Sequence, residues 1–207
     1  VESYGMICAE DEIGVGTDHA GIIVLPEDAK VGTPAAEYYG VESDWQIEVD
    51  LTPNRIDGAS HYGVARDLSA WLARHGKTAN LHRPSVDAFK TDRPDGAIGV
   101  TVENAEACPR YCGVTIRNVK VKESPKWLKD YLSAAGQRPI NNIVDITNYI
   151  LLGTGQPLHC FDLNKVKGGH VVVKTVTPGT KFVTLDGVER TLTDRDLMIC
   201  NDEEPMC

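Results

Sequence analysis

The residues best suited to chemistry lie in one stretch, residues 137–162. Within it Asn142, Asp145 and Asn148 recur three apart on a predicted helix, and Thr147 stands beside them. Asn, Asp and Thr are mediocre helix formers, because their side chains compete for backbone hydrogen bonds. Short amides and hydroxyls suit a small polar pocket, since they can hydrogen-bond a ligand without burying a charge.

A second interpretation of these residues stays open, in which they cap or brace neighbouring loops. His159, in the loop after the predicted helix, also has two interpretations. An imidazole titrates near neutral pH and has two ring nitrogens, so it can orient a water molecule or a carbonyl group. A single histidine in a loop is, however, more often structural than catalytic.

A run of basic residues precedes this stretch. Residues 110–130 carry six bases against Glu123 and Asp130. The six are Arg110, Arg117, Lys120, Lys122, Lys126 and Lys129. One interpretation is a solvated edge strand and helix face, since edge strands favour lysine. The functional interpretation is a track for a phosphate backbone.

Composition and charge limit the class of protein. The chain has 207 residues, 42% of them hydrophobic and 25% charged, which is typical of a globular protein. The net charge of -9 argues against a surface that grips nucleic acid everywhere. Residues 1–60 carry 13 acidic and two basic residues, whereas the remainder carries 17 acidic and 19 basic ones. A local basic face in the later part is therefore compatible with the sequence.

The cysteines and the termini lead to further expectations. The six cysteines include no C-x-x-C pair, and we interpret them as reduced thiols of a cytosolic protein. A zinc site assembled from Cys108, Cys112, His159 and Cys160 is less favoured, because zinc usually takes matched sets of closely spaced ligands. We expect no membrane span and no signal peptide. Since no initiator methionine is present, we expect a cut fragment or a processed chain.

Hydrophobic periodicity and turn residues predict an α+β fold in several pieces, with mixed or antiparallel sheets packed with a few helices. Ser60 and Ser124 are suitable N-caps, and Asp186-Gly187 predicts a two-residue hairpin turn. Predicted helices cover residues 60–75, 125–136 and 142–152, and predicted strands cover residues 4–9, 21–25, 45–51, 98–102, 111–121, 171–176, 182–185, 188–192 and 197–200. Residues 76–96 have the Gly and Pro content of a linker.

Three stretches make the sequence resemble the β subunits of bacterial phenylalanyl-tRNA synthetases. Residues 51–68 (LTPNRIDGASHYGVARDL) resemble the TPNR segment of that family and the helix after it. Residues 138–149 (RPINNIVDITNY) with residues 156–162 (QPLHCFD) resemble the centre of its editing module, and residues 184–192 (TLDGVERTL) resemble the hairpin that follows. Residues 4–25 resemble the last strands of its tRNA-binding OB-fold domain.

The resemblance implies a hydrolytic editing function. In this family the α subunit activates the amino acid, and the β subunit hydrolyses tyrosine wrongly attached to tRNA(Phe). Thr147, Asn148 and His159 match editing-pocket positions, so the resemblance implies catalytic roles for them. Thr147 and Asn148 would line the site around the aminoacyl ester, and His159 would position the ester or the attacking water. Arg138 and Asn142 would bind substrate or brace the pocket.

The resemblance also implies a domain organisation. Residues 1–43 would be the end of an OB-fold domain, residues 44–83 a strand-helix segment with a linker, and residues 84–207 an editing module truncated at its C-terminus. The family's pocket also uses a glycine-rich stretch and an acidic residue that follow the hairpin and lie beyond Cys207. We therefore expect an aminoacyl-ester hydrolase module that is incomplete in this chain, and no synthetase activity.

The implied partners are tRNA(Phe) and the synthetase α subunit in a heterotetramer, with no DNA, no membrane and a cytoplasmic location. The tRNA would contact Arg117, Lys120, Lys122, Lys126 and Lys129. No metal or organic cofactor is expected in this chain, because ATP and Mg²⁺ belong to the complete synthetase. One alternative is a non-catalytic part that docks tRNA, and another is the related C-terminal domain of tRNA-lysidine synthetases.

Overall fold

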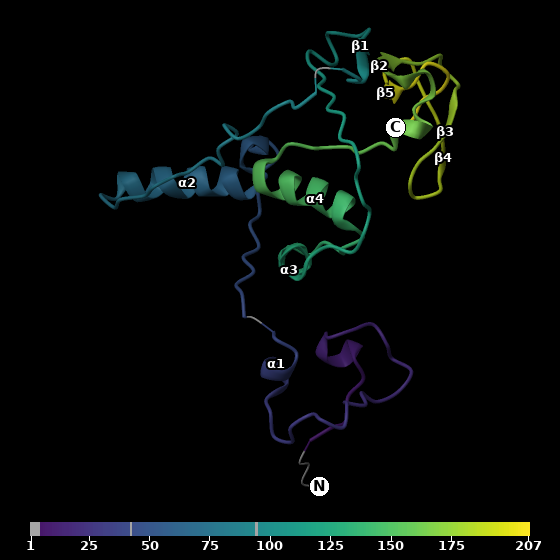
Figure 1. Ribbon diagram of the computed structural model, residues 1–207. Coiled ribbons are helices and arrows are strands. Elements are labelled where there is room, and N and C mark those ends of the chain that lie inside the picture. The colour runs from purple at the N-terminus through teal and green to yellow at the C-terminus, as the bar shows by residue number, and fades with distance from the viewer. Residues whose placement is uncertain (1–4, 42, 94) are drawn as a thin grey trace. The chain divides into compact units, whose positions relative to one another are not determined.

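The computed structural model describes residues 5–41, 43–93 and 95–207 (Figure 1). The chain divides into two units, Val1–Ile47 and Glu48–Cys207. The second unit contains three longer helices and all the strands of the described residues. It also contains every residue that the sequence singles out for chemistry, so the first unit needs only brief description.

The first unit is built from turns. It has a short helix α1, Ala35–Tyr38, and a 3₁₀ turn, Asp11–Ile13, that Gly14 ends in a left-handed conformation. The predicted strands at 4–9 and 21–25 are wrong for their described residues, which form no strand. One backbone hydrogen bond, from the Ile23 N–H to the Cys8 carbonyl, joins the two segments. Two short strands alone do not make a stable sheet.

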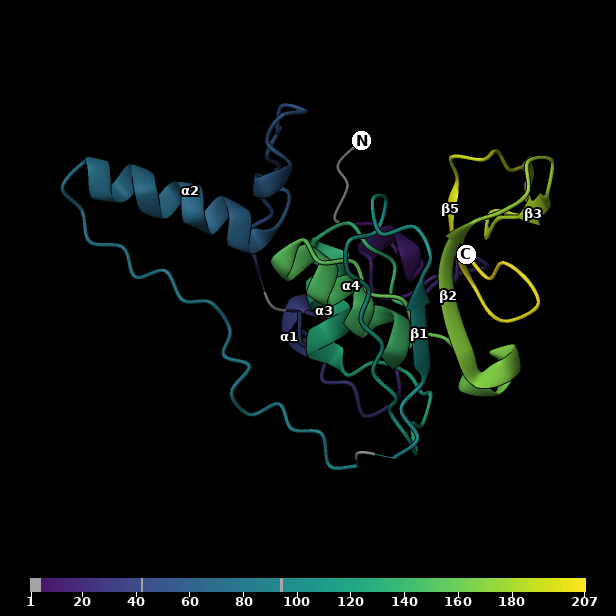
Figure 2. The same cartoon turned by 90° about the horizontal axis from the view of Figure 1, so that it is seen from above.

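The longer helices form where the sequence predicts them, and side-chain caps define the start of two of the three. Helix α2 covers His61–Arg74, and the Ser60 hydroxyl accepts from the Gly63 N–H at 2.9 Å. Helix α3 covers Lys126–Ala134, and helix α4 covers Asn142–Thr154. The predicted N-cap role of Ser124 is wrong, because Pro125 occupies the N-cap position of α3 without a side-chain cap, and the Ser124 hydroxyl donates to Asp145 instead. Helix α4 contacts both α2 and α3, and Figure 2 shows α3 and α4 side by side.

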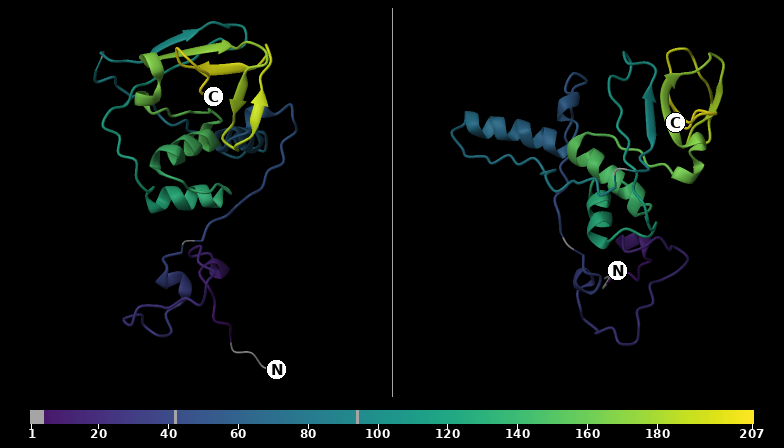
Figure 3. Two further views of the ribbon diagram at one scale, coloured as in Figure 1. Left: turned by 90° about the vertical axis from the view of Figure 1, so that its right-hand side faces the viewer. Right: turned by 45° about the horizontal axis from the view of Figure 1, so that its top comes forward.

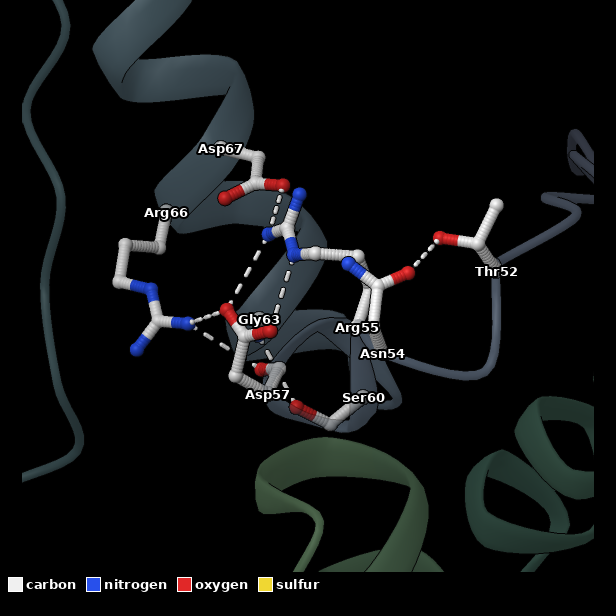
Figure 4. Close-up of polar contacts among 8 residues, drawn as sticks. All are labelled: Thr52, Asn54, Arg55, Asp57, Ser60, Gly63, Arg66 and Asp67. Atoms are coloured by element: carbon white, nitrogen blue, oxygen red, sulfur yellow. Dashed lines mark hydrogen bonds and ion pairs between the residues drawn. The ribbon is translucent and has the colours of Figure 1, made fainter.

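A network of charged side chains holds the turn before helix α2 (Figure 4). Arg55 donates to Asp57 at 2.9 Å and to Asp67 at 2.5 Å, and Arg66 donates to Asp57 at 2.5 Å. The hydrogen bond from Arg55 is the main reason that the pKa of Asp57 is lowered. All these groups are exposed to solvent, so we assign the network to local geometry rather than to stability.

The main sheet has three strands in the order β1-β2-β5 (Figure 3). Strand β1 covers Gly99–Val102 and is parallel to β2, His170–Thr175. Strand β5, Leu197–Cys200, is antiparallel to β2, with Val172 opposite Cys200. The central strand is buried on both faces, which explains its unbroken Val171–Val173 run.

A separate hairpin pairs β3, Lys181–Val183, with β4, Glu189–Thr191. The hairpin is where the sequence predicts it, but its loop is longer than the predicted two residues. The Thr184 N–H donates to the Val188 carbonyl, which leaves three residues in the loop. Gly187 takes the left-handed conformation, with φ 76°, that this kind of loop requires.

The apolar core of the second unit has two clusters on opposite faces of β2. Val172 packs with Leu192, Met198 and Cys200 on one face. Val166, Val171 and Val173 form the cluster on the other face. Helix α3 buries Leu128 and Leu132 outside these two clusters, and they are 2% and 0% exposed.

Two further predicted strands are wrong. Residues 45–51 and 111–121 have the alternating pattern of a strand but form none. Most of their apolar side chains are exposed, and Trp45 and Ile116 are 90% and 74% exposed. A strand needs backbone partners as well as a pattern, and within the described residues no neighbouring strand pairs with either segment.

The α+β fold class is confirmed, with a mixed sheet, an antiparallel hairpin and a small set of helices. The predicted boundaries at residues 43 and 83 and the OB-fold assignment stay predictions. In the described part of the chain, no helix has the length and apolar character needed to cross a bilayer.

Gly63 provides a test of how tightly the turn packs on helix α2. A Cβ atom there would lie 2.4 Å from the Asp57 carbonyl oxygen and 2.8 Å from the Gly58 Cα. We expect Gly63→Ala to reduce the free energy of unfolding by about 1–3 kcal/mol, because backbone atoms must move. Urea unfolding followed by far-ultraviolet circular dichroism measures the change.

Gly153, in helix α4, is the matched control. Nothing lies within 4 Å of a Cβ built there. Gly153→Ala should stabilise the chain by roughly 0.5–1 kcal/mol, since alanine is the better helix former. Equal urea midpoints for the two variants would contradict the close approach at Gly63.

Candidate functional site

Helix α4 carries two of the predicted catalytic residues and is fixed at both ends. The Asn141 side-chain oxygen accepts from the Ile143 and Val144 N–H groups at 3.0 and 3.1 Å. At the other end Gly155 has φ 76°, and its N–H donates to the Leu151 carbonyl. An Asn N-cap and a left-handed Gly are the residues these positions favour. The middle of the helix is therefore held in a regular geometry.

A buried carboxylate ties two other segments to this helix. Asp145 is 0% exposed and accepts from the Ser124 hydroxyl at 2.5 Å and from the Ile140 N–H at 2.8 Å. Ser124 precedes helix α3, and Ile140 belongs to the loop that carries Arg138. Both segments are thus attached to the first turn of α4. Arg138 itself is exposed.

Asn142 fastens the basic segment to the same turn. Its side-chain oxygen accepts from the Lys122 N–H at 3.0 Å, and its Nδ2 donates to the Lys120 carbonyl at 3.0 Å. Its backbone N–H donates to the Lys122 carbonyl at 2.9 Å. These contacts are those of a bracing residue. The alternative role of Asn142, contact with substrate, stays a prediction.

Thr147 and Asn148 differ in their hydrogen bonding. The half-buried Thr147 hydroxyl donates to the Val144 carbonyl, one turn earlier, at 2.6 Å. The half-buried Asn148 amide makes no hydrogen bond to any residue in the ranges that the structure describes. A side-chain amide offers two donors and one acceptor. Asn148 can therefore contribute donors and an acceptor to a ligand.

His159 is held by an aromatic contact. Its ring centre lies 4.3 Å from that of Phe161 at an interplanar angle of 42°. Phe161 in turn packs against the Val166, Val171 and Val173 cluster. Among the described residues, no group hydrogen-bonds the ring nitrogens of His159, and the residue is exposed. The ring is thus positioned through its face while its nitrogens are accessible.

The predicted basic residues differ in how their charges are used. Lys126 pairs with Asp130 at 2.6 Å, and Lys129 pairs with Glu123 at 2.5 Å. The hydrogen bond from Lys129 is the main reason that the pKa of Glu123 is lowered. Lys120 and Lys122 are exposed and make no ion pair within the described ranges. Their ammonium groups are therefore accessible to an anion.

Arg117 lies at the start of the same segment. Its Nη2 donates to the Gly96 carbonyl at 3.5 Å. Its charge also contributes to the lowered pKa of Asp95, although the hydrogen bond from Arg93 is the larger cause. The Arg117 guanidinium thus already interacts with the Gly96 carbonyl and the Asp95 carboxylate of the same chain.

A row of polar residues that no sequence pattern identifies joins the sheet to the turn after β5. The His170 Nε2 lies 3.0 Å from the Thr101 hydroxyl, and its Nδ1 lies 3.1 Å from an Asp202 oxygen. The three residues come from β1, β2 and that turn, 69 and 32 positions apart. No local signal could reveal contacts at such separations.

Two hollows lie near the sheet, and neither is lined by Thr147, Asn148 or His159. One, of about 350 Å³, lies between the hairpin and β5 and is lined by Phe182, Arg190, Met198 and others. The other, of about 410 Å³, adjoins the end of β2 and is lined by Glu103, Lys174 and Asn201 among others. In the described part of the chain, no group of three or more metal-binding side chains is arranged around one point.

Comparison with known protein families gives a match to part of the second unit. Residues 107–207 match the family described as the B3/4 domain. This region contains all ten residues for which the sequence predicts a part in catalysis, substrate binding or tRNA binding.

Similarity to whole proteins is more specific. The chain is 68% identical over 207 residues to the phenylalanine–tRNA ligase beta subunit of Bacteroides fragilis, covering 100% of this chain and 25% of that protein. The corresponding subunits of Porphyromonas gingivalis and Salinibacter ruber are 62% and 47% identical, again over 25% of their lengths and over 100% and 99% of this chain. Over essentially its whole length the chain is therefore similar to the β subunits of phenylalanine–tRNA ligases, and it spans about a quarter of their length.

The buried Asp145 carboxylate provides a test of the site's framework. Asp145→Ala would leave the Ser124 hydroxyl and the Ile140 N–H without their acceptor. We expect the free energy of unfolding to fall by roughly 2–4 kcal/mol, because the buried Ser124 hydroxyl and the part-buried Ile140 N–H both lose their acceptor. Urea unfolding of the full chain measures it.

Asp130→Ala is the control, since Asp130 is an exposed carboxylate paired with Lys126. Its effect should stay within about 0.5 kcal/mol. Similar losses for both variants would show that burial at Asp145 does not distinguish the two carboxylates.

Proposed function

We propose that residues 107–207 belong to an editing module that hydrolyses tyrosine wrongly attached to tRNA(Phe). The observation that supports this most is the match of the segment holding Thr147, Asn148 and His159 to the B3/4 domain family. The whole chain is also 68% identical to a phenylalanine–tRNA ligase beta subunit. The proposed substrate, tyrosine esterified to tRNA(Phe), is the one that the sequence resemblance implies.

The proposed reaction is hydrolysis of an ester. Water adds to the carbonyl carbon of the aminoacyl group, and the bond between that carbon and the ribose oxygen breaks. The products are free tyrosine and a tRNA with its 3′-terminal hydroxyl restored. His159 would orient the water or the ester through an accessible ring nitrogen. Asn148 would hydrogen-bond the aminoacyl end, while Thr147 lines the same region.

A hydrolytic site is needed because tyrosine differs from phenylalanine by one hydroxyl. A hydrophobic synthetic pocket rejects such an addition only weakly, so a second site improves accuracy. An editing pocket that hydrogen-bonds the phenol would discriminate against phenylalanine, since phenylalanine would leave its polar groups unpaired.

The proposed partners follow from the same relationship. The module would receive the 3′ end of tRNA(Phe) in the cytoplasm, within an assembly that includes the synthetase α subunit. We assign no cofactor to the module. In this proposal ATP and Mg²⁺ serve the synthetic reaction of the complete ligase.

A second candidate function is docking of tRNA without catalysis. The observation that favours it is the pair of accessible ammonium groups on Lys120 and Lys122, whose backbone Asn142 fastens to helix α4. In addition, neither of the two hollows near the sheet is lined by the predicted catalytic residues. Docking would place these lysines on the phosphate backbone.

The distinguishing experiment measures release of tyrosine from Tyr-tRNA(Phe). The present chain is compared with a longer chain that includes the following part of the β subunit. We expect His159→Ala to lower the rate of whichever form is active by at least about 100-fold, the range found for positioned acid–base groups. His82→Ala, an exposed histidine before β1, serves as the control with an unchanged rate.

Each outcome separates the two candidates. Release that depends on His159 supports editing. Inactivity of both forms, together with salt-sensitive tRNA binding, rejects editing and supports docking. An active chain that tolerates His159→Ala contradicts the role of this residue.

A further inference from the structure

Trp127 is a large aromatic residue exposed beside the candidate site. It lies in the first turn of helix α3, and 59% of it is exposed. Its ring meets that of Tyr149, on helix α4, edge to face at 5.6 Å and 84°. Tyr149 directly follows Asn148, so the indole is attached to the helix that carries the predicted catalytic residues.

Trp127 is one end of a row of rings that crosses three helices. Tyr149 contacts Tyr131 at 5.1 Å and 63°, and Tyr131 contacts His61 at 5.5 Å. His61, at the start of α2, is fixed by a contact of its Nδ1 with the Leu152 carbonyl at 2.9 Å. The row restrains the indole before any ligand arrives, which lowers the entropy lost on binding.

Two accessible lysines, Lys120 and Lys122, are attached to the same helix α4. The backbone of Lys120 and Lys122 is bonded to Asn142 in the first turn of α4. Tyr149 is seven residues further along that helix, or about 10 Å at 1.5 Å per residue. The backbone that carries the two lysines and the ring that contacts Trp127 are thus attached to one helix about two turns apart.

We propose that Trp127 is a stacking platform for one unpaired base of single-stranded RNA, with the adjacent backbone phosphates on Lys120 and Lys122. A flat aromatic face next to positive charge is the arrangement by which proteins bind single strands, because every base has a π-face and every nucleotide a phosphate. This inference rests on the proposed function and specifies how the unpaired 3′ end of tRNA would be held.

Fluorescence can test the contact directly. The chain has three tryptophans, so Trp45→Phe with Trp71→Phe leaves Trp127 as the single emitter. Titration with a single-stranded oligoribonucleotide ending in CCA should quench this emission, as ring stacking does. The matching fully paired duplex should quench it far less. Equal quenching by both probes would overturn the stacking proposal.

Affinity measurements separate stacking from charge. Trp127→Ala should weaken binding of uncharged tRNA(Phe) by about tenfold without changing the dependence of affinity on salt. Trp127→Phe should restore much of the affinity. Lys120→Ala with Lys122→Ala should instead reduce the slope of log affinity against log salt by about 0.7 for each phosphate that no longer has a lysine partner. Trp71→Ala, at an exposed tryptophan on α2, is the control.

The stacking proposal and the proposed editing function can be rejected independently of each other. If Trp127→Ala leaves affinity and KM for Tyr-tRNA(Phe) unchanged while tyrosine release continues, the platform is rejected and editing survives. If Trp127 stacks on RNA while no chain releases tyrosine, the platform survives and the editing function is rejected. Circular dichroism of each variant confirms that the helices remain folded.

Discussion

The Asp145 carboxylate is the group on which the arrangement of the second unit depends. A buried carboxylate is costly unless hydrogen-bond donors replace the water that it loses. Here the donors come from Ser124, two residues before α3, and from the loop before α4. Because each donor belongs to a different segment, satisfying one charge also sets the positions of Arg138, of α3 and of the helix that carries Thr147 and Asn148. Asn142 extends this connection to the lysine-bearing segment.

The helices can be predicted from sequence because their signals are local. Ser60, Asn141 and Gly155 each determine a helix end through contacts within a few residues. The strands at 98–102, 171–176 and 197–200 are predictable for a similar reason, since their apolar runs are short and bounded. Residues 45–51 and 111–121 carry the same alternating signal, yet no strand forms there. A sheet depends on partners that a strand's own residues do not specify.

The candidate site shows the same difference between features with a local sequence signal and features that depend on distant partners. The cluster of Asn, Asp and Thr residues is recognisable from composition, and the structure distinguishes residues that brace, such as Asn142 and Asp145, from Asn148, whose amide is accessible. Which lysines are neutralised by Glu123 and Asp130 depends on how the side chains are placed in space. Sequence reasoning could not predict the row formed by Thr101, His170 and Asp202. Its members are distant in sequence, and none of these residue types by itself indicates a contact.

The contact between His61 and Leu152 has a consequence for synthesis of the chain. The two residues are 91 positions apart, so α2 exists for some time before α4 does. At about 5–20 residues per second, translation takes roughly 5–18 seconds to cover that interval. During this time the face of α2 that later contacts α4 has no partner, and Leu68 and Trp71 remain half exposed even in the finished fold. The nascent chain therefore exposes this face of α2 to solvent until α4 has been synthesised.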